Sequence, residues 1–138
     1  MRTIKCKVGK FTIDFQMRHQ ITLLCDDSAT GKSFVFTLLK NAKIKGVFLL
    51  DVDSLKSFSS NEDVFQALKS SNTNTVIIDE ADAVFECCDG LQTMIEQDLK
   101  NDYILISRSN TIRTDISDFA TLGFKDNTFS LNYYFNVL

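Results

Sequence analysis

The sequence predicts an α/β protein with a mostly parallel sheet, flanking helices, and β-hairpins at the N-terminal and C-terminal ends. Short apolar runs rich in β-branched residues alternate with longer segments of helical pattern. Strands that alternate with helices pair in parallel through right-handed crossovers. Turn residues at Gly9 and at 125–127 separate two pairs of runs near the two ends of the chain. We expect residues 1–138 to form a single domain.

The first half of the chain is predicted to contain four strands and one helix. The first two strands form a hairpin that turns at Gly9, where glycine tolerates a tight backbone. The segment after Ser33 has the dense apolar content of a helix that packs against a sheet. The predicted elements are the strands 2–7, 11–16, 20–25 and 46–51 and the helix 31–42.

The second half is predicted to contain two helices and four strands. The first of these helices begins near Asn61, with Ser60 or Asn61 as its N-cap. The second is interrupted near Gly90. The predicted elements are the helices 61–69 and 83–98 and the strands 75–80, 103–107, 119–124 and 128–135.

Composition narrows the classes of function. The chain has 15 basic and 18 acidic residues, for a net charge of −3, which argues against a dominant nucleic-acid surface but is compatible with a local basic patch. No apolar run approaches the roughly 20 residues that cross a bilayer, and the N-terminus lacks the apolar core of a signal peptide, so we expect a cytoplasmic protein. The four cysteines have no metal-binding spacing, and we expect reduced, packed thiols. The single histidine, His19, is expected in a solvated turn.

A phosphate-binding loop is the main chemical motif. An apolar strand leads into residues 26–33, which end in Gly31, Lys32 and Ser33. Backbone N–H groups of such a loop and of the helix that follows converge on phosphate oxygens. The lysine reaches the β- and γ-phosphates, and the serine hydroxyl is a ligand of Mg²⁺. The loop residues expected to bind the nucleotide are Ser28, Ala29, Thr30, Gly31, Lys32 and Ser33.

A second motif follows the strand 75–80. Its β-branched run ends in Asp79 and Glu80, so a buried parallel strand would deliver two carboxylates to the edge that holds the loop. With both motifs the chain resembles the P-loop NTPases, with the loop as Walker A and these acids as Walker B. The resemblance implies the P-loop NTPase fold, Asp79 as a Mg²⁺ ligand and Glu80 as the residue that polarises the attacking water. Glu80 directs it to the catalytic-glutamate division, which includes ATP-binding-cassette and AAA-type ATPases, in a minimal single-domain form.

The strand 103–107 extends the resemblance. In that division, a strand inserted between the loop strand and the Walker B strand ends in a polar sensor near the γ-phosphate. Ser107 matches this position, and Arg108 follows it. The alternative is that both are ordinary strand-end residues that face solvent. Cassette ATPases also stack an aromatic ring on adenine, and Phe11 and Phe15 are candidates, although a role in the core is the preferred interpretation.

Three groups of acidic residues near the two Walker motifs also need an interpretation. Asp26 replaces the first glycine of the loop motif, and its negative charge would repel phosphate. Either its side chain points outward and the loop binds phosphate, or the loop is a relic. Asp51 and Asp53 follow a strand at the same edge, where they could contact the outer shell of the metal, but solvated caps are the preferred interpretation. On the next helix, Asp82, Glu86 and Asp89 are expected on a solvated face.

The function that follows is a small Mg²⁺-dependent ATP-binding protein and ATPase with slow intrinsic turnover. Arg108 and Arg113 are the only arginines placed to assist hydrolysis, and the cassette signature and helical lid are missing. A homo-oligomeric or protein partner would therefore be needed for fast turnover. The alternative is a pseudo-enzyme that keeps the fold and binds a protein or DNA partner without hydrolysis. A small-molecule kinase is a weaker third interpretation.

Overall fold

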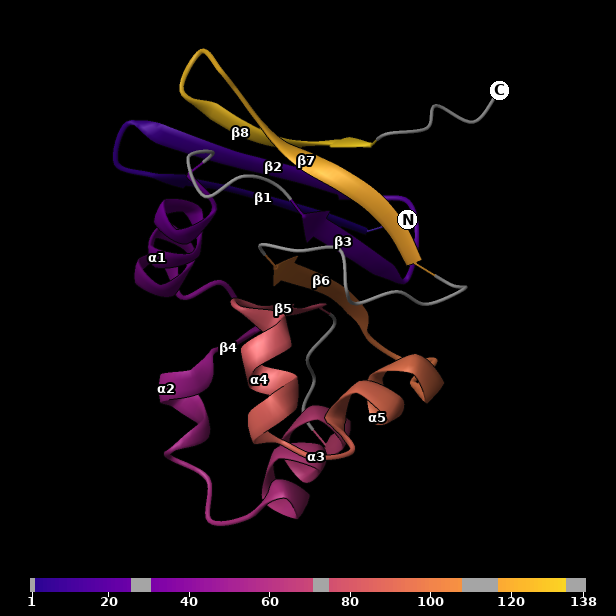
Figure 1. The fold of residues 1–138 in the computed structure, drawn as a ribbon. Coiled ribbons are helices and arrows are strands. Elements are labelled where there is room, and N and C mark those ends of the chain that lie inside the picture. The colour runs from indigo at the N-terminus through magenta and orange to yellow at the C-terminus, as the bar shows by residue number, and fades with distance from the viewer. Residues whose placement is uncertain (1, 26–30, 71–74, 108–116, 134–138) are drawn as a thin grey trace.

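The computed structural model describes residues 2–25, 31–70, 75–107 and 117–133. They form eight strands and five helices (Figure 1). The strands are β1 Arg2–Val8, β2 Phe11–Met17, β3 Ile21–Cys25, β4 Val47–Leu50, β5 Thr75–Ile78, β6 Asp102–Ser107, β7 Ser117–Lys125 and β8 Thr128–Tyr133. The helices are α1 Lys32–Ala42, α2 Val52–Leu55, α3 Asn61–Ser70, α4 Ala81–Cys87 and α5 Leu91–Gln97.

All eight strands belong to one mixed, mostly parallel sheet with the order β1-β2-β8-β7-β3-β6-β5-β4. Only β1 with β2 and β7 with β8 pair antiparallel. The predicted α/β class and both terminal hairpins are thus confirmed. The hairpins are not separate additions to the sheet, because β2 pairs in parallel with β8, with Thr12 opposite Thr128. The strand β6 lies between β3 and β5, which is the order that the resemblance implies.

Two layers of helix cover opposite faces of this sheet (Figure 1). On one face α1 packs against the hairpin strands and the central strands, where Ile13, Leu24 and Ile104 are buried. On the other face α3, α4 and α5 cover the strands from β3 to β4, where Leu23 and Leu105 are buried. Because side chains alternate along a strand, Leu23 and Leu24 enter different cores. The strands β3, β6, β5 and β4 pair in parallel, so their carboxyl ends share one edge of the sheet.

The helix boundaries confirm most of the expected capping. Ser60 is the N-cap of α3, since its hydroxyl accepts the Asp63 N–H at 3.2 Å. The predicted helix 83–98 is two helices, α4 and α5, divided at Gly90, whose φ is 85°. The short helix α2 was not predicted. No helix among the described residues is long and apolar enough to cross a membrane.

Candidate functional site

The start of α1 forms one wall of the candidate site. Gly31 precedes the helix in a left-handed conformation with φ 88°, and its carbonyl accepts the Val35 N–H at 3.0 Å. A Cβ at this position would meet no described atom within 4 Å. The backbone conformation, rather than crowding, is therefore what favours glycine here. Residues 26–30, which include Asp26 and the predicted contacts Ser28, Ala29 and Thr30, lie outside the described residues.

Lys32 connects α1 to the end of β6. Its side chain is 5% exposed, and its Nζ donates a hydrogen bond to the Ser107 carbonyl at 3.4 Å. Burial of an ammonium group is unfavourable unless polar or anionic groups surround it. A buried lysine that opens into a polar cavity is thus suited to bind an anion.

Asp79 and Glu80 follow β5 at the same edge. The Asp79 N–H donates to the Leu50 carbonyl at 2.9 Å, which fixes the end of β5 against β4. An Asp79 carboxylate oxygen accepts the Glu80 N–H at 3.0 Å. Burial, together with the negative charges of Glu80 and Asp51, raises the pKa of the Asp79 carboxyl above its ordinary value. A cation beside Asp79 would therefore relieve an unfavourable charge.

Glu80 has an uncommon backbone conformation. It is the N-cap of α4 with φ 49° and ψ 53°, in the left-handed region that residues with a Cβ seldom occupy. N-cap residues usually have extended backbones and accept a hydrogen bond from the first turn through the side chain. The Glu80 side chain makes no such cap bond and is exposed. Its carboxylate is thus held at the cavity without a capping role.

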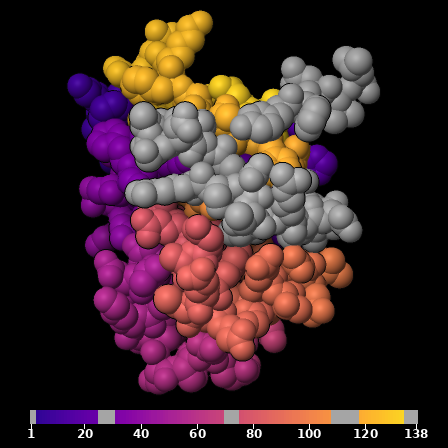
Figure 2. All heavy atoms as spheres, in the orientation of Figure 1, coloured from indigo at the N-terminus to yellow at the C-terminus, as the bar shows by residue number. Residues whose placement is uncertain are grey.

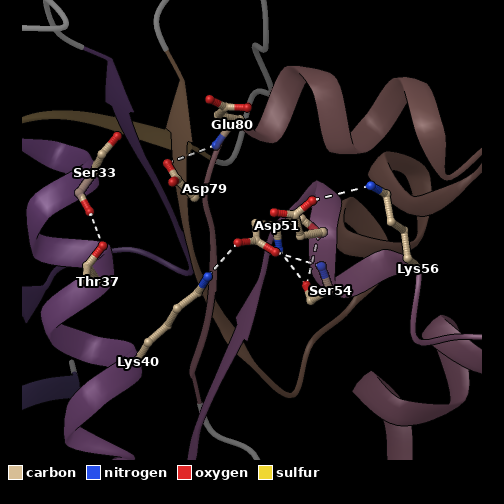
Figure 3. A network of polar contacts seen from close by, with 9 residues as sticks. Ser33, Thr37, Lys40, Asp51, Ser54, Lys56, Asp79 and Glu80 are labelled. Carbon is tan, nitrogen blue, oxygen red and sulfur yellow. Dashed lines mark hydrogen bonds and ion pairs between the residues drawn. The ribbon is translucent and has the colours of Figure 1, made fainter.

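These side chains line one cavity of about 240 Å³. Figure 3 shows Ser33 on α1 near Asp79 and Glu80 at the end of β5. The cavity lies between the start of α1, the end of β5, the start of α4 and the end of β6. Its described lining residues are Lys32, Ser33, Asp79, Glu80, Asp82, Ala83, Ile106 and Ser107. Five predicted site residues therefore meet in one place, although they come from three separate parts of the chain.

The structure corrects two interpretations at this cavity. Ser107 is 2% exposed, so the alternative in which it faces solvent is wrong. Asp82 is half-buried and lines the cavity, whereas the sequence was interpreted as placing it on a solvated face. Glu86, one turn further along α4, is exposed as predicted. Arg108 and Arg113 lie outside the described residues.

Asp51 is a cap, as predicted. It begins α2 with a capping box, in which its carboxylate accepts the Ser54 N–H and the Ser54 hydroxyl accepts the Asp51 N–H, both at 2.8 Å (Figure 3). Lys40 Nζ lies 2.8 Å from its other oxygen. Burial alone would raise the pKa of Asp51, but hydrogen bonds from Lys40 and Ser54 outweigh burial and lower it. Asp53 is exposed and contacts Lys56 at 3.5 Å.

The two phenylalanines considered for stacking on adenine, Phe11 and Phe15, have different environments. Phe15 is 1% exposed and belongs to the core beneath α1, as preferred from the sequence. Phe11 is half-buried, and its ring lies 5.2 Å from the Phe34 ring, centroid to centroid. Of the two rings, only Phe11 lies at a partly open surface.

The histidine and the described cysteines do not line this cavity. The described residues contain no group of three or more His, Cys, Asp or Glu side chains arranged to hold a metal ion. His19 is half-exposed, and its Nε2 lies 3.2 Å from an Asp118 oxygen, so the expectation of a purely solvated turn residue was incomplete. Cys88 is buried, and burial raises the pKa of its thiol. Cys87 is exposed, which corrects the expectation of packed thiols.

Comparisons with protein-family models and with curated proteins find no match for this chain.

Proposed function

We propose that the chain binds magnesium-bound ATP in this cavity and hydrolyses it slowly. The observation that carries the proposal is the meeting of a buried lysine, a helix-terminal serine and two adjacent carboxylates in one cavity at the sheet edge. The lysine and the serine begin α1, and the two carboxylates follow β5, so the fold brings together two pairs of residues that are far apart in the sequence. The strand order, with β6 between β3 and β5, also supports assignment to the P-loop NTPases of the catalytic-glutamate division.

The residues present fit the phosphate groups and the metal. The N–H groups at the start of α1 and the Lys32 ammonium offer positive potential to phosphate oxygens. The Ser33 hydroxyl and the Asp79 carboxylate are hard oxygen ligands of the type that Mg²⁺ prefers. When bound, Mg²⁺ neutralises charge on the phosphates. The raised pKa of Asp79 is consistent with a site that gains stability from a cation.

Glu80 is the residue proposed to orient the attacking water. Its carboxylate is exposed, lines the cavity and does not cap α4. Ser107 is proposed as the sensor of the terminal phosphate, since it lines the same cavity from β6. No arginine lines the cavity among the described residues. Because an arginine contributes about 10³–10⁵ in rate to such reactions, we expect slow turnover without one.

Calorimetric titration with Mg-ATP tests this proposal. Wild-type protein is expected to bind, and Lys32→Ala is expected to lose at least tenfold in affinity. Lys69→Ala is the matched control, because Lys69 is an exposed lysine on α3, far from the cavity lining. Equal binding by wild type and Lys32→Ala, or binding by neither, would refute the proposal.

Glu80→Gln separates nucleotide binding from hydrolysis. The amide keeps the size of the side chain but cannot accept a proton from water. This variant is expected to bind Mg-ATP like wild type and to release no phosphate above background. If wild type itself binds without measurable turnover, the pseudo-enzyme alternative, prompted by Asp26 in the loop motif, replaces the ATPase.

A further inference from the structure

Charge is divided unevenly between two parts of this protein. Residues 2–25 and 31–46, which form the N-terminal hairpin, β3 and α1, contain nine lysines and arginines and one acid, Asp14. Residues 47–70 and 75–107, which form the remaining parallel strands and α2–α5, contain twelve acids and three lysines. The net charge of −3 therefore hides a strongly basic part beside a strongly acidic one. Such a division creates a local positive potential that total charge does not reveal.

Five exposed lysines form what we call the lysine stripe: Lys5, Lys7, Lys10, Lys43 and Lys45. Lys5 and Lys7 lie on one face of β1, the edge strand of the sheet, because they are two residues apart. This face is opposite to the one on which Ile4 and Phe11 pack toward α1, so the stripe passes around the edge strand. Lys5 and Lys45 line one surface groove of about 350 Å³, between β1 and the turn that precedes β4. Lys43 ends α1 beside that turn.

The lysine stripe forms no ion pair within the described residues, although Asp14 lies directly opposite Lys5 in the pairing of β1 with β2. Other basic side chains of this part of the protein are paired: Arg18 with Asp118 and Lys40 with Asp51. No ion pair to the five stripe lysines is formed by any acid in the described part of the chain. Lysines on an edge strand discourage association with other strands, which accounts for Lys5 and Lys7. Protection of the edge strand does not account for Lys43 and Lys45, which lie outside the sheet.

Exposed aromatic rings lie at the Lys10 end of the stripe. Lys10 Nζ is 5.4 Å from the centre of the Phe11 ring, and Phe11 lies 5.2 Å from Phe34 and 6.2 Å from Phe124. Phe34 is 45% exposed and Phe124 is 54% exposed, and only one other large apolar side chain of the described residues is exposed. In Figure 2 the tips of the two hairpins and α1 lie next to one another. We call Phe11, Phe34 and Phe124 the aromatic platform.

We propose that the lysine stripe and the aromatic platform together bind single-stranded nucleic acid. Phosphates would follow the lysines, and unpaired bases would stack on Phe34 and Phe124. A basic track combined with exposed aromatic rings is the pattern that binds single strands without sequence preference. A duplex hides its base faces, and the acidic half of a second copy would match the lysines but leave the platform uncovered. This inference is independent of the proposed ATP site.

The lysine stripe is tested by fluorescence anisotropy with a labelled single-stranded oligothymidine and the full chain. We expect binding at low salt, with a plot of log affinity against log salt that falls with a slope of about −0.7 for each neutralised phosphate. Lys5→Ala/Lys45→Ala is expected to weaken binding at least tenfold and to reduce the slope by about 1.4, or twice 0.7. The control Lys56→Ala/Lys69→Ala removes two exposed lysines from the acidic part and is expected to leave both quantities unchanged.

The platform is tested by Phe34→Ala and by Phe124→Ala. Both rings are largely exposed, so the variants are expected to fold, which circular dichroism verifies. Each is expected to weaken oligonucleotide binding about tenfold with an unchanged salt slope, because stacking is lost but no charge is removed. An unchanged slope separates a stacking contact from a general loss of structure.

Several results would overturn the inference. One is the absence of oligonucleotide binding at low salt, and another is equal weakening by the two lysine double variants. Duplex binding that is equally tight and insensitive to Phe34→Ala would remove the role of the platform. A concentration-dependent dimer that Lys5→Ala/Lys45→Ala abolishes, without oligonucleotide binding, would assign the stripe to a second copy. Weaker Mg-ATP binding by Phe34→Ala, with unchanged oligonucleotide affinity, would assign the platform to the nucleotide.

Discussion

Replacement of Glu80 by glycine is expected to stabilise the protein relative to replacement by alanine. Glu80 has φ 49° and ψ 53°, and a residue with a Cβ in this region costs about 1–2 kcal/mol. Glycine removes that cost but loses roughly 0.5–1 kcal/mol more chain entropy on folding. At the middle of these two ranges, the net advantage of Glu80→Gly over Glu80→Ala is about 0.7 kcal/mol. For a chain of this size it corresponds to a rise in Tm of about 2–4 °C.

The comparison with Glu80→Ala separates the effect of the backbone conformation on stability from the effect of losing the carboxylate. Both variants lose the carboxylate, which is exposed and makes no cap bond, so its removal changes stability little. Thermal unfolding followed by circular dichroism gives Tm for both variants under the same conditions. If the alanine variant proves as stable as the glycine variant, Glu80 stores no strain and the reasoning is wrong. Both variants are expected to lose hydrolysis, because both lose the carboxylate that we propose orients the attacking water.

Four further substitutions, one of them a control, test packing in the core and charges at the sheet edge. Asp51→Ala is expected to lose about 1 kcal/mol of unfolding free energy at neutral pH, because the N-cap of α2 is removed. The control Asp53→Ala removes a side chain that is 88% exposed and is expected to change the unfolding free energy by less than about 0.5 kcal/mol. Since the folded-state pKa of Asp51 is lowered, its charge stabilises the fold above the ordinary carboxyl range and this part is lost at lower pH. Asp79→Asn is expected to raise the denaturation midpoint of the ligand-free protein at pH 7. That gain should vanish below the ordinary carboxyl range, because the raised pKa of Asp79 makes ionisation unfavourable for folding. Phe15→Ala is expected to cost about 3–5 kcal/mol in urea unfolding, since the ring is fully buried, and a loss below about 1 kcal/mol would contradict its core role.

Local patterns predicted most elements of the fold but not every pairing between them. Apolar β-branched runs located the strands, and the turn at Gly9 located the first hairpin. The parallel pairing of β2 with β8 joins segments more than 100 residues apart, and no local pattern encodes it. The four-residue helix α2 has no apolar periodicity to reveal it. It depends instead on the reciprocal hydrogen bonds of Asp51 and Ser54, whose pattern resembles that of many turns.

The candidate site was predictable where strand ends carry it. Asp79 directly follows the buried strand β5, and Ser107 is the last residue of the buried strand β6. Because the two strands are parallel, these positions lie at one edge of the sheet. Asp82 was missed because helical spacing alone does not tell which face of α4 borders a cavity. The backbone strain at Glu80 was also beyond prediction, since glutamate has no preference for the left-handed region. Such conformations arise where the surrounding structure overrides local propensity.

The helix α1 takes part in both proposed binding surfaces. Ser33 lines the cavity, whereas the next residue, Phe34, contacts the aromatic ring of Phe11 on the hairpin side. Lys43 at the other end of α1 belongs to the lysine stripe. A ligand that shifted α1 at one surface would therefore also displace residues of the other surface. If the two ligands are coupled, linkage requires equal effects in both directions. The fold-change that an oligonucleotide causes in Mg-ATP affinity must then equal the fold-change that Mg-ATP causes in oligonucleotide affinity. Unequal factors at equilibrium would mean that the two ligands do not bind the same folded molecule.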